Sequence, residues 1–300
     1  MSAFLLLIVC PLLGALFARQ RWMPEESFGV LNAWLLRVAF PALVLERVPT
    51  LSFDRALVFA ALAPWVVLLG SALLLGALGR RLGWSRASTG ALVLTCGLGN
   101  TAFIGLPMIQ ALIGPQALGA ALIADQLGSF LGLSTVGVAL AAAYAGDRLS
   151  PGIIAQRVLR FPPFLALMLA LLVGQLGGWP PAVSELLHRL GETLTPIALF
   201  VVGLQFRLGA LRGRVGLVAT GLAWKLLLAP LAVWALALAS GSAGGLPATV
   251  GVLQAAQGPM ITAGILAASH RLDPPLVTLV VGLGILLSFA SVPLWFWALG

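Results

Sequence analysis

The stretch GLGNTAFIGLP, residues 97–107, interrupts a long apolar run with three glycines, two polar residues and a proline. Proline lacks a backbone donor and clashes with the preceding helical turn, and glycine permits close approach of another backbone. We therefore expect a helix here to unwind between Gly99 and Pro107. Hydrocarbon cannot satisfy freed backbone groups, so such a stretch inside a membrane must be packed in protein or line a cavity. The stretch predicts a broken membrane helix beside a site.

A second stretch of this kind, QAAQGP at residues 254–259, interrupts another apolar run. Two unwound segments in opposite orientations can cross at the middle of a membrane, where half-helix N-termini offer N–H groups and a partial positive charge. Such a point suits an anion, above all a carboxylate, and the side chains of Asn100, Thr101, Gln254 and Gln257 can add hydrogen bonds. A pair of proline kinks with satisfied interhelical contacts is the alternative interpretation.

The composition of the whole chain places these two stretches in a membrane. Of 300 residues, 60% are hydrophobic and only 9% are charged, and the mean hydropathy is +1.07. Soluble domains carry about 25% charged residues. A soluble enzyme, a disordered protein and a nucleic-acid-binding domain are therefore not expected. The net charge of +8 is explained by basic loops beside a bilayer, so no nucleic acid partner is predicted.

Polar residues divide the chain into ten apolar runs, most of them close to the roughly 20 residues that a membrane helix needs. The runs are 3–18, 28–45, 56–78, 88–112, 117–144, 161–178, 190–206, 215–239, 246–269 and 275–298. The connections after odd-numbered runs hold 12 of the 17 basic residues, against 3 in the other connections and termini. The positive-inside rule then makes the odd-numbered connections cytoplasmic. We predict an all-α, multi-pass protein of the bacterial inner membrane, with both termini on the periplasmic side.

The two halves of the chain share a pattern of prolines. Each half has one proline in its second, third and fourth runs: Pro41, Pro64 and Pro107, then Pro196, Pro230 and Pro259. The offsets between partners are 155, 166 and 152 residues. Since five runs is an odd number, the second half must enter the membrane from the opposite side. We predict an inverted repeat, 1–145 and 161–300, joined by a cytoplasmic linker, 146–160.

Three motifs give the chain a family resemblance. Residues 99–107 (GNTAFIGLP) resemble the signature of the auxin efflux carrier family, and TPIALFVVGLQ at 195–205 and ADQLG at 124–128 are similar to its bacterial permease branch. The resemblance covers essentially the whole chain. The family contains plant auxin carriers and bacterial permeases, some of them described as malonate transporters.

The resemblance implies crossed broken helices 4 and 9, as in bile acid symporters and sodium–proton antiporters. It also implies elevator transport, with helices 1, 2, 6 and 7 as scaffold and homodimer surface and helices 3–5 and 8–10 as transport domain. By this resemblance Asn100, Thr101, Pro107 and Pro259 fall at the substrate crossover. Two departures limit it: the central loop is short, and GP at 258–259 follows Gln257 where the family suggests a proline pair.

Three ionisable residues lie well inside apolar runs: Arg37, Asp125 and Lys225. Each costs at least a few kcal/mol at the bilayer centre unless it is paired or hydrated. Asp125 is predicted either to couple transport to H⁺ or Na⁺, or to form a structural pair with Lys225. Lys225 either balances the charge of a substrate or extends towards an interface. Arg37 is assigned to a structural role or a subunit contact.

The other charged residues are assigned to loops. Glu46, Arg47, Asp54 and Arg55 form a cluster that a solvated connection explains, and His188 and His270 both fall in predicted loops. The membrane therefore lacks a serine–histidine pair, Asp125 is alone in its run, and no phosphate-binding loop, dinucleotide motif or metal-ligand spacing occurs. An enzyme is not expected, and neither is a cofactor beyond a coupling ion.

These patterns predict a secondary transporter of a small organic anion, and the family resemblance implies a carboxylate such as malonate or an auxin-like acid. The expected site comprises Asn100, Thr101, Gly105, Pro107, Gln254, Gln257 and Pro259, with Asp125 and Lys225 in coupling or charge balance. A sodium- or proton-coupled transporter of another solute class is the alternative, followed by a channel.

Overall fold

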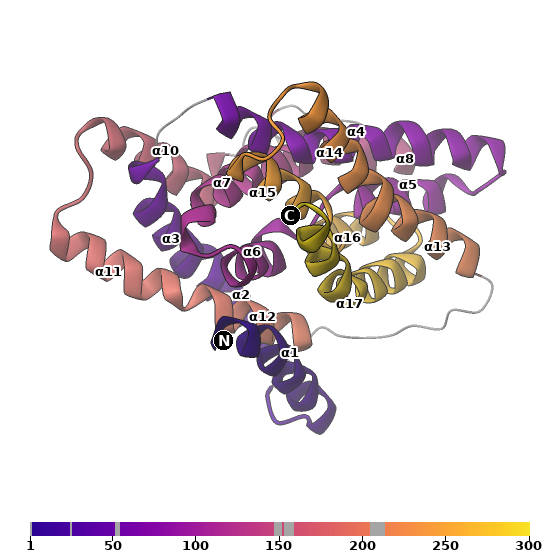
Figure 1. The fold of residues 1–300 in the computed structure, drawn as a ribbon. Coiled ribbons are helices and arrows are strands. Elements are labelled where there is room, and N and C mark those ends of the chain that lie inside the picture. Colours follow the sequence, from indigo (N-terminus) through magenta and orange to yellow (C-terminus); the bar gives the residue numbers. More distant parts are fainter. Residues whose placement is uncertain (1, 25, 52–54, 147–151, 153–158, 205–213) are drawn as a thin grey trace. The chain divides into compact units, whose positions relative to one another are not determined.

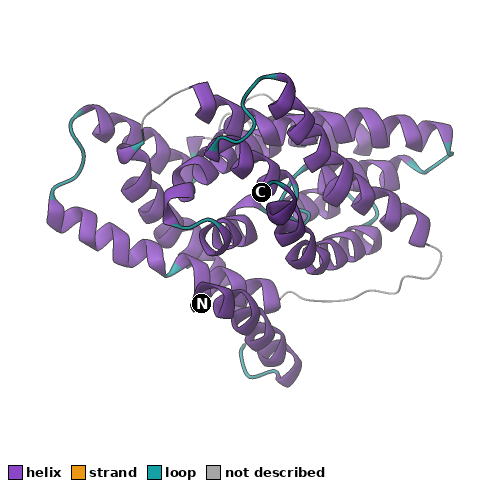
Figure 2. Ribbon diagram, viewed as in Figure 1, coloured by secondary structure: helices purple, strands orange, loops and turns teal. Residues whose placement is uncertain are grey.

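The computed structural model describes residues 2–24, 26–51, 55–146, 152, 159–204 and 214–300. In these ranges the regular elements are all helices, and the β contact is an isolated bridge rather than a strand (Figure 2). The chain divides into two compact units. Unit 1 comprises Met1–Phe53, Ala102–Leu122 and Gln156–Phe206, and unit 2 comprises Asp54–Thr101, Ile123–Ala155 and Arg207–Gly300.

Unit 1 contains the helices α1 (Ser2–Gln20), α2 (Ser27–Trp34), α3 (Phe40–Arg47), α6 (Leu106–Leu112), α10 (Pro162–Gln175), α11 (Pro181–Glu192) and α12 (Leu194–Leu204), shown in Figure 1. Helix α1 packs against α12. Their backbones touch through glycine, because a Cβ atom at Gly14 would overlap the carbonyl oxygen of Phe200, and one at Gly203 would overlap that of Pro11. Small residues of this kind permit close helix packing in membranes.

Unit 2 contains the helices α4 (Arg55–Arg81), α5 (Arg86–Gly97), α8 (Val138–Ala145), α13 (Val215–Ala223), α14 (Ala229–Ala239), α15 (Leu246–Ala255), α16 (Ile261–Ser269) and α17 (Pro274–Ala298). Helix α4 packs against α5, α14 and α15. The core between them is apolar and includes Leu68, Leu92 and Val252, all at most 1% exposed. The short α7 (Leu118–Ile123) leads from unit 1 into unit 2.

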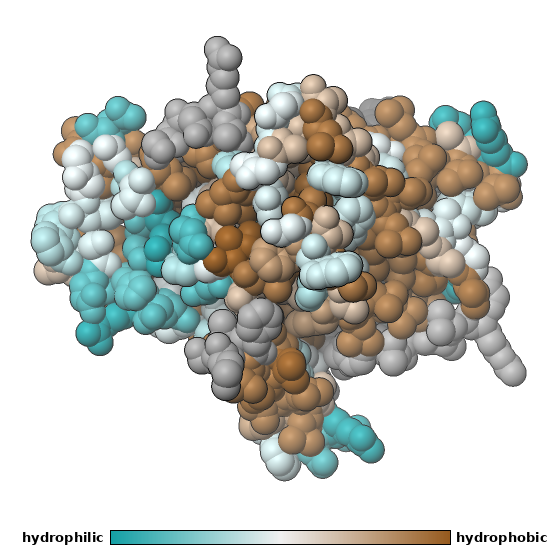
Figure 3. All heavy atoms as spheres, viewed as in Figure 1, coloured by the Kyte–Doolittle hydropathy of each residue, from teal (hydrophilic) through white to brown (hydrophobic). Residues whose placement is uncertain are grey.

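Five helical stretches are long and apolar enough to cross a membrane. They are Ser27–Thr50, Leu57–Arg81, Pro115–Ala145, Val215–Ala239 and Pro274–Ala298, and they coincide with the second, third, fifth, eighth and tenth predicted runs. Large apolar side chains on the surface of these helices are exposed, and much of the visible surface is hydrophobic (Figure 3). Soluble monomers rarely expose apolar patches of this extent. The prediction of an all-α, multi-pass membrane protein is therefore confirmed.

Each of the three intramembrane charges lies in a turn of π-helix. Arg37 is in Leu35–Ala39, Asp125 in Ala124–Phe130 and Lys225 in Trp224–Leu228. A proline follows the first and third turns after two residues, at Pro41 and Pro230, and removes a donor from the helical ladder. The indole of Trp295 instead donates to the carbonyl of Leu226, 2.9 Å away. Widened turns of this kind are frequent at functional sites.

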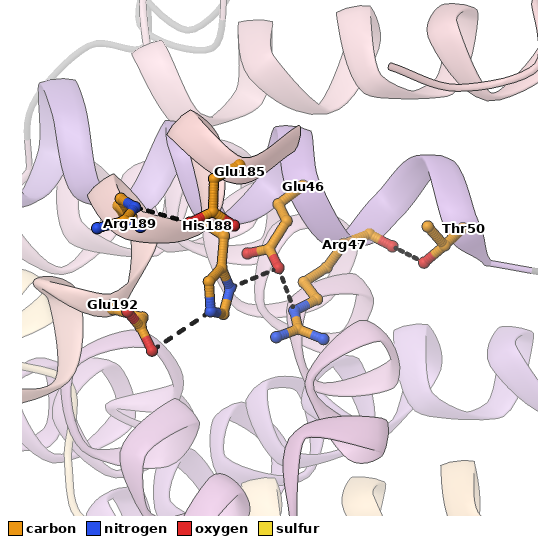
Figure 4. A network of polar contacts seen from close by, with 7 residues as sticks. All are labelled: Glu46, Arg47, Thr50, Glu185, His188, Arg189 and Glu192. Carbon is orange, nitrogen blue, oxygen red and sulfur yellow. Dashed lines mark hydrogen bonds and ion pairs between the residues drawn. The ribbon is translucent and has the colours of Figure 1, made fainter. Parts of the chain in front are cut away.

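The structure corrects two assignments to loops (Figure 4). Glu46 and Arg47 lie in the last turn of α3, Arg55 is the first residue of α4, and His188 lies in α11. The Nδ1 atom of His188 is 2.9 Å from Oε1 of Glu46, and Nε2 is 3.4 Å from Glu192. The sequence did not predict helix α11 as a separate helix, because the charged residues on one of its faces lower its mean hydropathy. Asp54 and most of the linker 146–160 lie outside the described residues.

Candidate functional site

Two broken helices meet in unit 2. Helix α5 ends at Gly97 and helix α15 ends at Ala255, and an antiparallel bridge joins Gly99 to Pro259. The N–H of Asn100 donates to the carbonyl of Gly258 at 2.8 Å, and the N–H of Met260 donates to the carbonyl of Leu98 at 2.9 Å. Each broken segment therefore satisfies backbone groups of the other, as a non-helical segment within a membrane requires. We call residues 98–100 and 256–260 the crossing.

A glycine lies on each side of the crossing, where space for a side chain is small. A Cβ atom at Gly99 would lie 3.0 Å from the carbonyl oxygen of Gln254 and 3.2 Å from Nζ of Lys225. A Cβ atom at Gly258 would lie 2.8 Å from the Cα atom of Ile285. Gly99 thus allows close approach to the end of α15, and Gly258 allows close approach to α17.

The unwound part of the first segment is shorter than predicted. Helical structure resumes at Thr101 as a π-helix, Thr101–Gly105, and continues as α6 from Leu106. Pro107 therefore lies in helical structure, two residues after the π-helical turn, rather than in an unwound stretch. Gly105 and Pro107 belong to unit 1, whereas the other seven predicted site residues belong to unit 2.

The polar side chains beside the crossing are buried. Asn100, Thr101, Gln254 and Gln257 are at most 4% exposed. Nε2 of Gln254 donates to the carbonyl of Thr101 at 3.4 Å. Neither Oε1 nor Nε2 of Gln257 has a hydrogen-bond partner among the described residues. Each buried polar atom without a partner lowers the stability of a folded protein by roughly 1–3 kcal/mol. A ligand with both a donor and an acceptor would satisfy the two amide atoms of Gln257.

A buried carboxyl group lies next to the crossing. Oδ1 of Asp125 accepts a hydrogen bond of 2.5 Å from the hydroxyl of Thr101, and Oδ2 accepts one of 2.8 Å from Nε2 of Gln126. Asp125 makes no ion pair with a described residue. Oε1 of Gln126 and Oγ of Ser129 are also buried and have no hydrogen-bond partner within the part of the chain that the structure describes. Gln126 and Ser129 were not predicted, although both follow Asp125 within one turn.

Lys225 is fully buried, with 0% of its surface exposed. Its Nζ donates a hydrogen bond of 2.5 Å to the carbonyl of Ala255, at the end of α15. It neither reaches an interface nor forms an ion pair with Asp125 or another described residue. Burying an ammonium group costs several kcal/mol. A hydrogen bond by a charged group returns roughly 1.5–3 kcal/mol, and a helix C-terminus returns up to about 2 kcal/mol.

A second polar cluster lies at the start of α17 and was not predicted. Oδ1 of Asp273 accepts 2.5 Å from Nη1 of Arg214, and Oδ2 accepts 2.7 Å from the hydroxyl of Ser88. Burial alone would raise the pKa of Asp273, but these hydrogen bonds and the charge of Arg214 hold it below its ordinary value. The cluster ties α5 and α13 to α17. Among the described residues, no group of His, Cys, Asp or Glu is arranged to hold a metal ion.

Comparison with known proteins adds the family. A family model described as membrane transport protein matches residues 1–296. The chain belongs to the membrane transport protein family. This is the family of the auxin efflux carriers, so the resemblance inferred from the motifs is confirmed. Membership places the chain among multi-pass membrane transport proteins.

Two archaeal relatives of this membrane transport protein align over nearly their whole length. An uncharacterized transporter of Methanothermobacter thermautotrophicus is 26% identical, covering 96% of this chain and 94% of the relative. An uncharacterized transporter of Methanocaldococcus jannaschii is 23% identical, covering 100% of this chain and 98% of the relative.

Proposed function

We propose that this member of the family is a secondary transporter of a small organic anion, a carboxylate such as malonate or an auxin-like acid. The observation that carries the proposal is the crossing of two broken helices in unit 2, with buried polar side chains around it. Discontinuous helices that meet in this way are where secondary transporters bind substrate. In this proposal the crossing lies at the midplane of a bundle of ten membrane helices, built as two inverted repeats.

The proposed charge of the substrate follows from the helix ends. Helical structure resumes at Thr101 and at Ile261, immediately after each half of the crossing. The N-terminus of a helix carries partial positive charge and N–H groups, both of which favour an anion. The amide of Gln257 adds a donor for one carboxylate oxygen. Lys225 contacts the opposite, C-terminal end of α15 and so leaves these N-termini to the substrate.

The mechanism that we propose is elevator-type alternating access. The division of the chain supports it: unit 2 contains the crossing, Asp125 and Lys225, whereas unit 1 contains α1, α2, α10 and α12. Unit 2 would move as the transport domain, and unit 1 would remain as the scaffold and dimer surface. Asp125 is the proposed coupling group, because a buried carboxyl with neutral partners can bind H⁺ or Na⁺.

The proposal is tested with purified protein in liposomes. Uptake of labelled malonate, other small dicarboxylates and indole-3-acetate is measured with and without imposed sodium or proton gradients. We expect saturable uptake of one carboxylate, accelerated by unlabelled substrate on the far side, because exchange is a property of a carrier and not of a passive pore. Stimulation by one gradient that is lost in Asp125→Asn identifies the coupling ion.

A matched pair of variants tests the site. Asn100→Ala is expected to abolish uptake while leaving assembly and melting temperature near those of the native protein. Gln116→Ala, which changes an exposed amide in unit 1, is expected to transport normally. Normal uptake by Asn100→Ala contradicts the proposed site, and uptake that is linear in concentration, with no exchange, favours the channel.

A further inference from the structure

Lys225 is buried at the crossing without a carboxylate. Its Nζ is bonded to the carbonyl of Ala255, the last residue of α15, and lies beside Gly99. None of the described carboxylates lies within ion-pair distance of it. Asp125, in the fifth apolar run, is bonded to Thr101 and Gln126 instead. The positive charge therefore needs another source of compensation.

The C-terminus of α15 contacts the ammonium group, and a second helix C-terminus lies at the same crossing. Helix α5 ends at Gly97 and helix α15 ends at Ala255, and both ends adjoin the crossing. A helix C-terminus carries partial negative charge on its unpaired carbonyl groups. In secondary transporters, half-helix C-termini and unwound carbonyls of this kind coordinate the coupling cation. In this chain the atom bonded to such a carbonyl is the nitrogen of a lysine.

The surroundings of Lys225 are built to keep it there. The side chain projects from the π-helical turn Trp224–Leu228, whose carbonyl at Leu226 is bonded by Trp295. The next carbonyl after Ala255, that of Ala256, accepts a hydrogen bond from the hydroxyl of Ser291 at 3.4 Å. Two consecutive carbonyls at this end of α15 are thus bonded by side chains of the protein.

We propose that Lys225 is a tethered cation, occupying a position at the crossing that would otherwise be a site for a dissociable monovalent cation. The native protein then needs no free ion at this place. Removing the ammonium group and its stem opens a site that small monovalent cations fill. Lys225 is thus a positioning residue, because it is bonded to the end of α15 beside Gly99 and acts on substrate only through the crossing. The inference rests on the proposed function only in taking the crossing as the substrate site.

The test measures melting temperature by tryptophan fluorescence, in detergent and without substrate. Its outcome therefore does not depend on whether the proposed transport function is correct. Native protein, Lys225→Ala and Lys225→Met are compared in chloride salts of sodium, potassium, ammonium and methylammonium. Choline chloride keeps the ionic strength constant and serves as the cation that is too large to enter. Lys225→Ala leaves room for a cation, and Lys225→Met fills the same space without charge.

We expect Lys225→Ala to melt lower than the native protein in choline and to regain stability, with saturation, in at least one small cation. The native protein and Lys225→Met are expected not to share this response, and subtracting the Lys225→Met curve removes effects at other sites such as Asp125. Lys225→Ser, which also leaves room, makes the same measurement possible if Lys225→Ala cannot be purified. Equal responses of all variants, or a Lys225→Met protein as stable as the native one, would overturn the proposal.

Discussion

At the scale of single residues, Gln257 combines complete burial with two amide atoms that lack partners among the described residues. Asn100, Thr101 and Gln254 lie beside the same crossing and are also buried. The sequence identified all four, because polar side chains in an apolar run carry a cost that function must offset. It did not identify Gln126 and Ser129, whose importance depends on their position around Asp125.

Replacing Gln257 by methionine is expected to separate binding from stability. The unbranched side chain of methionine fits the same space and removes two unsatisfied polar atoms, so the melting temperature should stay the same or rise by a few degrees. Uptake of the carboxylate should fall at least about tenfold, since the loss of one hydrogen bond to a charged group is worth roughly 1.5–3 kcal/mol. Gln116→Met, on the surface, should change neither quantity. A large fall in melting temperature for Gln257→Met would instead mark Gln257 as a structural residue.

Asp273 gives a prediction about pH. Its pKa is lower in the folded protein than its ordinary value of about 3.9. The stability that it contributes is therefore present above that value and is lost as the pH falls through the folded pKa. Asp273→Asn should lower stability by about 1–3 kcal/mol at neutral pH, and asparagine tolerates the left-handed backbone found there, with φ of 45°.

The measurement for Asp273→Asn is melting temperature from pH 8 to pH 3. The difference from the native protein should be constant down to about pH 5 and should shrink below about pH 4. A difference that is independent of pH throughout would show that the charge of Asp273 contributes nothing. Asp273→Asn should leave substrate affinity unchanged, because the residue is not part of the crossing.

At the scale of elements, two kinds of irregularity interrupt the α-helices. Prolines and glycines break α5 from the helix that follows and α15 from α16, and π-helical turns carry the three intramembrane charges. Both are irregularities that soluble helices seldom need. In a membrane they are placed where another side chain or segment satisfies the freed backbone groups. The bond from Trp65 Nε1 to the carbonyl of Leu127, 2.9 Å, is a further example.

The packing of α1 on α12 gives a prediction at this scale. Gly203→Ala places a methyl group against the backbone of Pro11, and overpacking of this kind costs typically 1–3 kcal/mol. Gly29→Ala is the matched control in α2 of the same unit, because nothing lies within 4 Å of a Cβ atom there. Gly203→Ala should lower the melting temperature by several degrees, and Gly29→Ala should leave it unchanged or raise it. Equal effects would contradict a close α1–α12 contact.

At the scale of the whole molecule, the two units are assembled from interleaved parts of the chain, each from three segments. Sequence neighbours such as Thr101 and Ala102 fall in different units. The division therefore does not follow the two halves that the proline pattern predicts as repeats. Interleaving of this kind allows each half of the chain to contribute to both a static and a moving body, as the elevator proposal requires.

Distance measurements between spin labels test this division in a background with Cys10 and Cys96 replaced by alanine. The pair Leu82→Cys and Ala243→Cys lies within unit 2, whereas Ala182→Cys lies in unit 1. On addition of substrate, the distance within unit 2 should stay constant. The distance between Ala182 and Ala243 should change, because a rigid-body motion leaves internal distances intact. A change within unit 2, or none between the units at saturating substrate, would contradict elevator transport.

The sequence by itself determined the class of the protein, the two places where its helices break and the family to which it belongs. These follow from composition, hydropathy and the local effects of proline and glycine, all of which act over a few residues. Only the tertiary structure decided how short the unwound part at 98–100 is, that Lys225 bonds to Ala255 rather than to Asp125, and that α11 is a helix paired to α3. Those outcomes depend on which groups meet across more than twenty residues of chain, and no local pattern records such contacts.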